Sequence, residues 1–249
     1  MLRYAITDRI RLAANESERQ SALLAQASHL AAAGVDFIQL REKDLSAAAL
    51  ADLARRLLAV LRTHQPAPRL LINSRADVAL ATRADGVHLS SSPDALTPAE
   101  VRALYAAAAL PEPIISLSCH TLAEVVRAAS TAPENRPTHI LFGPIYEKVV
   151  AMNSHSIMSC HSERSEESPH SARYATASSE GKSAKEAASK SSIVDKKVCE
   201  GAGLDLLRTV CLAATPIPVL ALGGITKANA AATLAAEAAG IAAIRLFLK

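Results

Sequence analysis

Aromatic side chains are scarce in this chain: they make up 3% of its 249 residues, and tryptophan is absent. Hydrophobic residues nevertheless account for 50% of the sequence. The core must therefore consist mainly of Ala, Leu, Ile and Val. Small aliphatic side chains of this kind suit helices packed closely around a parallel sheet, so the composition favours an α/β fold.

Cysteine pairs, long apolar runs and an excess of charge are also missing. The four cysteines, Cys119, Cys160, Cys199 and Cys211, show neither CxxC pairs nor zinc spacing, which predicts reduced thiols and a cytoplasmic protein. The formal net charge of +3 is too small to indicate a nucleic-acid or membrane-surface partner. No apolar run approaches the roughly 20 residues of a membrane span, and we expect no secretory leader.

The chain does have a regular alternation of short apolar runs and helix-forming stretches. Strands are expected at residues 3–7, 35–40, 69–72, 86–89, 114–118, 139–142, 216–222 and 241–247. Helices are expected between them, for example at residues 17–33, 46–61 and 226–239. Eight strands in this alternation predict a (β/α)8 TIM barrel that forms a single domain over residues 1–249.

Two irregularities interrupt this pattern. Residues 149–198 are rich in Ser, Lys, Glu and Ala without a sustained apolar period, so we interpret them as a disordered low-complexity insertion after the sixth strand. The chain also stops at Lys249, so the helix that should follow the eighth strand is missing. Apolar surface left uncovered there predicts association into a homo-oligomer.

The densest group of polar side chains follows the second expected strand. Gln39, Arg41 and Lys43 should point the same way, because side chains alternate along a strand. The carboxyl ends of the strands form the face where α/β barrels bind their ligands. In the alternative interpretation, Arg41 and Lys43 simply pair with Glu42 and Asp44 on a solvated loop.

A glycine pair, Gly223–Gly224, follows the seventh expected strand and precedes a helix. Backbone N–H groups at such a turn can approach an anion, and barrels commonly bind phosphate after strands seven and eight. Arg245, near the end of the eighth strand, could assist. The alternative is a tight turn without a ligand.

Two histidines are candidates for proton transfer. His88 lies within its expected strand and could instead fill the barrel interior, whereas His120 precedes a helix and could be exposed and idle. No dense group of carboxylates indicates a metal site.

Taken together, the strand-end motifs resemble those of the thiamine phosphate synthase family, whose thiazole tautomerase relatives share the barrel. The resemblance covers nearly all of the chain except the insertion. The motifs are Tyr4-Ala-Ile-Thr-Asp8, Gln39-Leu-Arg-Glu-Lys43, Leu71-Ile-Asn73, Ala84-Asp-Gly-Val-His-Leu89, Ser118-Cys-His-Thr121, Phe142-Gly-Pro-Ile-Tyr146 and Ala221-Leu-Gly-Gly-Ile-Thr226.

The resemblance implies a transferase of thiamine biosynthesis that condenses hydroxymethylpyrimidine pyrophosphate with thiazole phosphate. Pyrophosphate leaves first, and the thiazole nitrogen captures the pyrimidine-methyl cation. Arg41, Lys43 and Ser118 match the catalytic contacts to the pyrophosphate. The wider set that matches substrate-binding positions is Gln39, Arg41, Lys43, Asn73, Ser118, Lys148, Gly223 and Gly224. Arg245 stands where family members have a serine, and it could take over that phosphate contact.

The resemblance also implies Mg²⁺, but the expected ligands differ here. Ser74 and Pro93 stand where the family has two aspartates, and Asp94 is the adjacent carboxylate that could substitute. A hard cation prefers charged oxygen ligands, so we expect a weak or unusual dependence on Mg²⁺.

Two other functions stay open. Loss of the metal carboxylates fits a thiazole tautomerase, although such tautomerases carry a proton-transferring histidine where this chain has Pro144. The insertion and the missing last helix fit a non-catalytic paralogue that binds thiamine phosphate. Retention of Gln39, Arg41 and Lys43 together favours the synthase.

Overall fold

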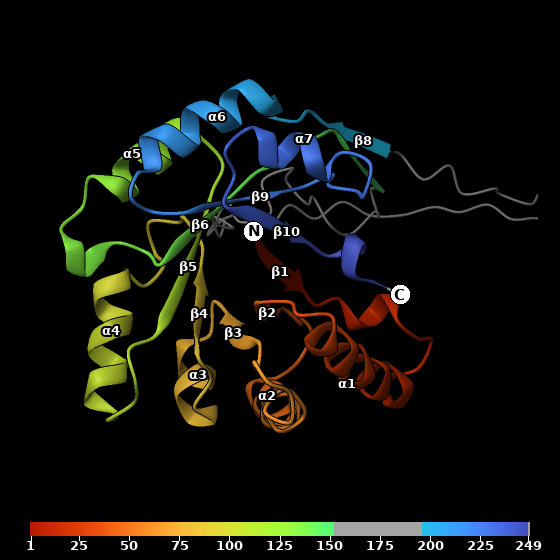
Figure 1. The fold of residues 1–249 in the computed structure, drawn as a ribbon. Coiled ribbons are helices and arrows are strands. Elements are labelled where there is room, and N and C mark those ends of the chain that lie inside the picture. The colour runs from red at the N-terminus through yellow and green to blue at the C-terminus, as the bar shows by residue number, and fades with distance from the viewer. Residues whose placement is uncertain (152–195, 249) are drawn as a thin grey trace, which may run out of the picture.

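A computed structural model describes residues 1–151 and 196–248, with side chains described for residues 1–147 and 200–248. Eight parallel strands close into a barrel surrounded by helices (Figure 1), so the expected (β/α)8 architecture is confirmed. The barrel strands are β1 (Leu2–Ile6), β2 (Phe37–Leu40), β3 (Arg69–Asn73), β4 (Gly86–Leu89), β5 (Ile114–Cys119), β6 (His139–Phe142), β9 (Val219–Leu222) and β10 (Gly240–Ala243).

Helices follow the strands and form the outer layer of the barrel (Figure 1). They are α1 (Glu16–Ala32), α2 (Ala47–Leu61), α3 (Ala76–Thr82), α4 (Pro98–Ala107), α5 (Leu122–Ala129), α6 (Gly203–Ala214) and α7 (Ala230–Ala235), with short 3-10 turns η1 (Arg9–Arg11), η2 (Pro133–Asn135) and η3 (Arg245–Phe247). Local capping explains several boundaries. Ser46 and Thr121 accept hydrogen bonds from the first turns of α2 and α5, and Gly34 ends α1 with a φ of +72°.

The strands run around the barrel in the order β1-β10-β9-β6-β5-β4-β3-β2, and β1 pairs with β2 to close it. The register places Asn73 beside His88, and His88 beside Ser116. Because parallel strands in register carry their alternate side chains to the same side, this row of polar residues lies inside the barrel.

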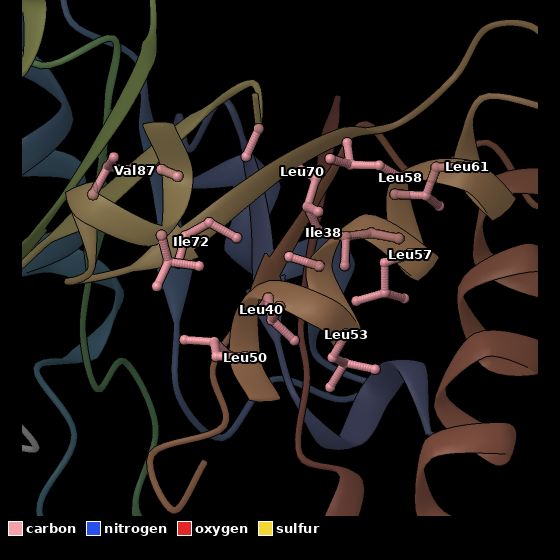
Figure 2. Close-up of a cluster of buried hydrophobic side chains, with 14 of the residues drawn as sticks. Ile38, Leu40, Leu50, Leu53, Leu57, Leu58, Leu61, Leu70, Ile72 and Val87 are labelled. Atoms are coloured by element: carbon pink, nitrogen blue, oxygen red, sulfur yellow. The ribbon is translucent and has the colours of Figure 1, made fainter. Parts of the chain in front are cut away.

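The apolar core has an outer and an inner part. Outside the barrel, Leu53, Leu57 and Leu61 of α2 pack against β2 and β3 and are at most 1% exposed (Figure 2). Inside it, the lower end is closed by the rings of Tyr4, Phe37 and His139, whose centroids lie 4.9–5.7 Å apart. Phe37 and His139 begin their strands, so the aromatic group lies at the amino end of the barrel and leaves the carboxyl end to polar side chains.

The last third of the chain differs from expectation in its boundaries. The strand expected at 216–222 begins only at Val219, because Pro216 and Pro218 have no N–H to donate to a neighbouring strand. The strand expected at 241–247 ends at Ala243, and the chain turns into η3. In η3 the carbonyl of Phe247 accepts a 2.8 Å hydrogen bond from Gln26 of α1.

Both ends of the segment interpreted as an insertion form strands. Lys148–Ala151 forms β7 and pairs antiparallel with β8, Lys196–Cys199, in a two-stranded ribbon. The disorder predicted for 149–198 stays a prediction, and residues 152–195 lie outside the described part. Among the described residues, η3 is the only helical element after β10, and none of their helices has the length and apolar character needed to cross a membrane.

Candidate active site

A buried arginine organises the loop that follows β2. Arg9, which is 2% exposed, contacts the carboxylates of Glu16, Glu42 and Asp44 at 2.9, 3.0 and 2.7 Å. These contacts raise the pKa of Arg9, Asp44 contributing most, and the Arg9 guanidinium lowers the pKa of Asp44. Burial raises the pKa of Glu42, against the effect of its hydrogen bonds to Thr7 and Arg9.

The same cluster sets the backbone of the neighbouring cation. The Thr7 hydroxyl donates to Glu42 at 2.6 Å and accepts the backbone N–H of Arg41 at 3.0 Å. Glu42 and Asp44 both bind Arg9, and no described ion pair joins either carboxylate to Arg41. Within the described residues, the partly exposed Arg41 side chain forms neither an ion pair nor a hydrogen bond.

Gln39 and Asn73 form a polar pair at the ends of β2 and β3. Gln39 is 1% exposed and donates through Nε2 to Asn73 Oδ1 at 2.7 Å. Its Oε1 is buried and has no hydrogen-bond partner among the described residues. An unsatisfied buried acceptor costs about 1–3 kcal/mol, so a ligand that donates a hydrogen bond to this oxygen would remove that cost.

His88 lies beside this pair, between two serine hydroxyls. Its Nδ1 is 2.8 Å from Ser116 Oγ, and its Nε2 is 3.0 Å from Ser118 Oγ. Burial, together with smaller contributions from the charges of His139, Arg41 and His120, lowers the pKa of His88 to about 3. The lowered pKa keeps the ring neutral near pH 7. His88 lies inside the barrel, as one of the two alternatives has it, and is 3% exposed, while proton transfer by His88 stays a prediction.

His120 is not idle at the surface. Its Nδ1 lies 2.6 Å from the carbonyl oxygen of Gly143, and its backbone N–H donates to Glu124 at 2.6 Å. A ring nitrogen bonded to a carbonyl must carry the proton. His120 thus connects the loop after β5 to the loop after β6.

The glycine pair after β9 packs against the loop after β6. Gly223 and Gly224 have φ values of +94° and +68°, and an added Cβ would approach Pro144 and Tyr146 at 2.7 and 2.6 Å. Packing and backbone conformation therefore already require both glycines. The helix expected at 226–239 begins only at Ala230, because the Asn229 side chain accepts the Thr226 N–H at 2.7 Å and forms a turn first.

Two further expected site residues are Arg245 and Lys148. Arg245 is exposed in η3, beyond the end of β10. Lys148 begins β7, and its side chain lies outside the described part of the chain.

Known proteins were compared with the chain as a whole. The family model described as thiamine monophosphate synthase matches residues 4–156 and 191–247. The chain belongs to this family. The two matched ranges contain seven barrel strands whole and β1 from Tyr4 onwards, and they omit 157–190 between them, within the segment that sequence reasoning treated as an insertion.

Individual relatives agree with the assignment to the thiamine monophosphate synthase family. A Geobacter sulfurreducens protein named provisionally as a thiamine-phosphate synthase is 34% identical over 97% of this chain and 84% of its own length. The thiamine-phosphate synthase of Solidesulfovibrio magneticus is 36% identical over 57% of this chain and 59% of its own. The solved thiamine phosphate pyrophosphorylase from Pyrococcus furiosus shares the fold, with a TM-score of 0.61, 23% identity and coverage of 98% and 85% of the two chains.

The side chains near the ends of β3 and β4 supply some, but not all, of the ligands that a magnesium ion needs. No group of three or more His, Cys, Asp or Glu side chains that could hold a metal occurs in the described ranges. A hollow of about 390 Å³ beside β3 and β4 is lined by Ser74 and Asp94, together with two other serines. Mg²⁺ is often bound through one or two carboxylates plus substrate phosphates. The hollow therefore fits an ion that the substrate helps to bind, and it does not fit a site built from protein ligands alone.

Arg9, Thr7 and Ser116 were not identified by sequence reasoning. Arg9 follows the first strand as one charged residue among several, and nothing local indicates that it is buried. Ser116 lies two residues before Ser118, so its position on the same face could have been inferred from strand alternation.

The buried cluster leads to a stability prediction. We expect Arg9→Met to lower the free energy of unfolding by about 3–5 kcal/mol, because it leaves the buried Glu42 without its partner. The matched control is Arg55→Met, which removes a pair to Asp52 between two exposed side chains and should cost no more than about 1 kcal/mol. Urea denaturation measures both changes, and equal values for the two variants would contradict the prediction.

His139 allows a prediction about pH. Burial lowers the pKa of His139 to about 4, so the unfolded chain binds a proton near its ordinary pKa of about 6.5 and the folded chain does not. The contribution of neutral His139 to the free energy of unfolding is therefore fully present above about pH 6.5. It is lost as the pH falls from there towards 4. His139→Phe keeps a ring between Tyr4 and Phe37 but cannot titrate.

We therefore expect the stability of His139→Phe relative to the wild type to be constant above about pH 7 and to rise by up to about 1.4 kcal/mol per pH unit below about pH 6. Chemical denaturation at a series of pH values measures this difference. A difference that does not change with pH would show that His139 titrates alike in the folded and unfolded chains.

Proposed function

We propose that this chain is a thiamine-phosphate synthase, which joins hydroxymethylpyrimidine pyrophosphate to thiazole phosphate and releases pyrophosphate. The bond between the pyrimidine methylene carbon and the pyrophosphate oxygen breaks, and the oxygen keeps the electron pair. The thiazole nitrogen then donates its lone pair to the methylene cation. Family membership supports this activity.

The observation that carries the proposal is the Arg41 guanidinium, which no described carboxylate neutralises. Its charge acts on His88 at the barrel mouth, next to the Gln39–Asn73 pair. A leaving group that develops negative charge is stabilised by fixed donors that are already in place. In this proposal Arg41, Lys43 and Ser118 contact the pyrophosphate, while Gln39 and Asn73 bind the pyrimidine, whose N–H groups suit the buried Gln39 Oε1.

The thiazole phosphate is assigned to the other side of the mouth. Gly223 and Gly224 turn their backbone there in a conformation that few other residues adopt. α7 has only six residues and starts later, so its dipole is not part of the proposal. The backbone N–H groups of the glycine turn, with Arg245 or Lys148 as the cation, are the proposed phosphate contacts.

Asp94 is the residue proposed to hold Mg²⁺, with Ser74 beside it in the same hollow. The ion would neutralise charge on the pyrophosphate of the bound substrate. With one carboxylate rather than two, binding of the ion should depend strongly on the substrate.

Arg41→Ala tests the proposal. We expect kcat/KM for thiamine phosphate formation to fall by about 30- to 1000-fold, which corresponds to the loss of about 2–4 kcal/mol from one strong anion donor. Arg55→Ala, on the outer face of α2, is the matched control and should leave kcat/KM unchanged. The assay combines both phosphorylated substrates and measures thiamine phosphate and pyrophosphate. Wild-type kinetics in Arg41→Ala would remove Arg41 from the site, and absence of product with the wild type would refute the synthase activity.

The metal proposal has its own test. Asp94→Asn should raise the Mg²⁺ concentration for half-maximal activity by about tenfold or more, because it removes the one carboxylate in the hollow. Ser74→Asp should lower that concentration, since it adds a second carboxylate at a position where φ is +54° and Asp is well tolerated. Magnesium titrations that coincide for the wild type and Asp94→Asn would show that Asp94 is not a ligand.

A further inference from the structure

A chain of three hydrogen-bonding side chains crosses the upper barrel from β5 to β4 and back to β5. Ser116, His88 and Ser118 are 0%, 3% and 5% exposed. The ring of His88 lies between the two hydroxyls, 2.8 Å from Ser116 and 3.0 Å from Ser118. A neutral imidazole has one donor nitrogen and one acceptor nitrogen. The two serines must therefore play opposite roles towards it.

Two arrangements satisfy the ring. In the first, the Ser116 hydroxyl donates to Nδ1, and Nε2–H donates to Ser118. In the second, Nδ1–H donates to Ser116, and the Ser118 hydroxyl donates to Nε2. The arrangements differ in what Ser118 offers to a ligand: its hydroxyl hydrogen remains available in the first and is used up in the second.

Burial of Ser116 selects between them. In the second arrangement the Ser116 hydroxyl hydrogen would need another acceptor, and His88 is the only partner of that hydroxyl in the described part of the chain. A buried donor without a partner costs about 1–3 kcal/mol. The first arrangement avoids that cost because Ser116 gives its hydrogen to Nδ1, so His88 carries its proton on Nε2.

We propose that Ser116 and His88 are positioning residues that hold the Ser118 hydroxyl ready to donate a hydrogen bond to the departing pyrophosphate. The first arrangement frees the Ser118 hydrogen, and an anionic leaving group accepts hydrogen bonds but cannot donate one. In the second arrangement Ser118 would present only lone pairs to that anion and repel it. The inference rests on the proposed function for the identity of the anion, and on the described geometry alone for the position of the proton.

The proton position is tested on the unmodified protein. Ring-¹⁵N-labelled histidine and NMR correlation of the ring nitrogens with the ring C–H groups distinguish the two tautomers. The spectrum of His88→Gln, which loses one of the eight histidines, assigns the His88 signals. We expect a protonated Nε2 and an unprotonated Nδ1 for His88 near pH 7. A protonated Nδ1 would overturn the proposal whether or not the chain makes thiamine phosphate.

The role of Ser118 is tested with inorganic pyrophosphate and isothermal calorimetry. His88→Gln can place its amide NH₂ near the Nε2 position and should keep affinity within about threefold of the wild type. The shorter His88→Asn cannot reach Ser118 in this way and should weaken binding by about 10- to 100-fold, the range for one hydrogen bond to a charged group. Thermal melting confirms that each variant is folded before binding is measured.

A double-mutant cycle separates this role from a structural one. Ser118→Ala alone should weaken pyrophosphate binding to a similar degree, and His88→Asn added to it should cause no further loss, because the hydroxyl that His88 orients is gone. A further loss in the double variant would show that His88 acts through general packing. Failure of the wild type to bind pyrophosphate would remove the donor role of Ser118. Binding with the expected cycle but without thiamine phosphate formation would leave the positioning role intact and refute only the proposed reaction.

Discussion

The barrel mouth depends on the ion-pair cluster around Arg9. In sequence, Arg41 stands next to Glu42, and such neighbours often pair with each other. Here Arg9 binds Glu42 and Asp44 instead, at 3.0 and 2.7 Å. Buried ion pairs add little net stability. The main effect of the Arg9 ion pairs is therefore on Arg41, whose guanidinium forms no ion pair with a described carboxylate.

The register of the strands determines which side chains lie near Arg41 at the carboxyl end of the barrel. Alternate side chains of β2 to β5 point inward, so the aromatic and aliphatic residues near the strand starts fill the lower barrel. The polar residues Gln39, Asn73, His88 and Ser118 reach the upper end together. Burial keeps His88 neutral, so the upper barrel holds oriented hydrogen-bonding groups and Arg41 supplies charge at its edge. This division places directional contacts deep in the site and the long-range attraction for an anion near solvent.

Sequence patterns of a few neighbouring residues were enough to predict the fold. Features that depend on residues far apart in the sequence were not predicted. The helix from Ser46 and the capping box at Thr121 depend on a few neighbouring residues, so their boundaries agree with the structure within a residue. The helix expected at 226–239 failed because Asn229 caps a turn that competes with it. Gln39, Asn73 and Ser118 were identified by their place at strand ends. Arg9 and Ser116 were missed because their roles depend on partners about 30 residues away in sequence, which no local pattern reveals.

Two features bear on how the carboxylates near Arg41 are used. Arg9 binds Glu42 and Asp44, and Ser74 and Pro93 stand where the family resemblance leads one to expect aspartates. A divalent ion held by two carboxylates brings little net charge to a pyrophosphate, because its ligands largely cancel it. In the proposed site, Arg41, which forms no ion pair with a described carboxylate, would bring its positive charge to the same place. In the proposed reaction, Ser74 and Pro93 in place of aspartates would shift the neutralisation of the leaving group from a metal held by the protein towards side-chain cations and oriented donors. The more of that charge Arg41 and Ser118 supply, the more their exact placement by Arg9 and His88 matters for the reaction.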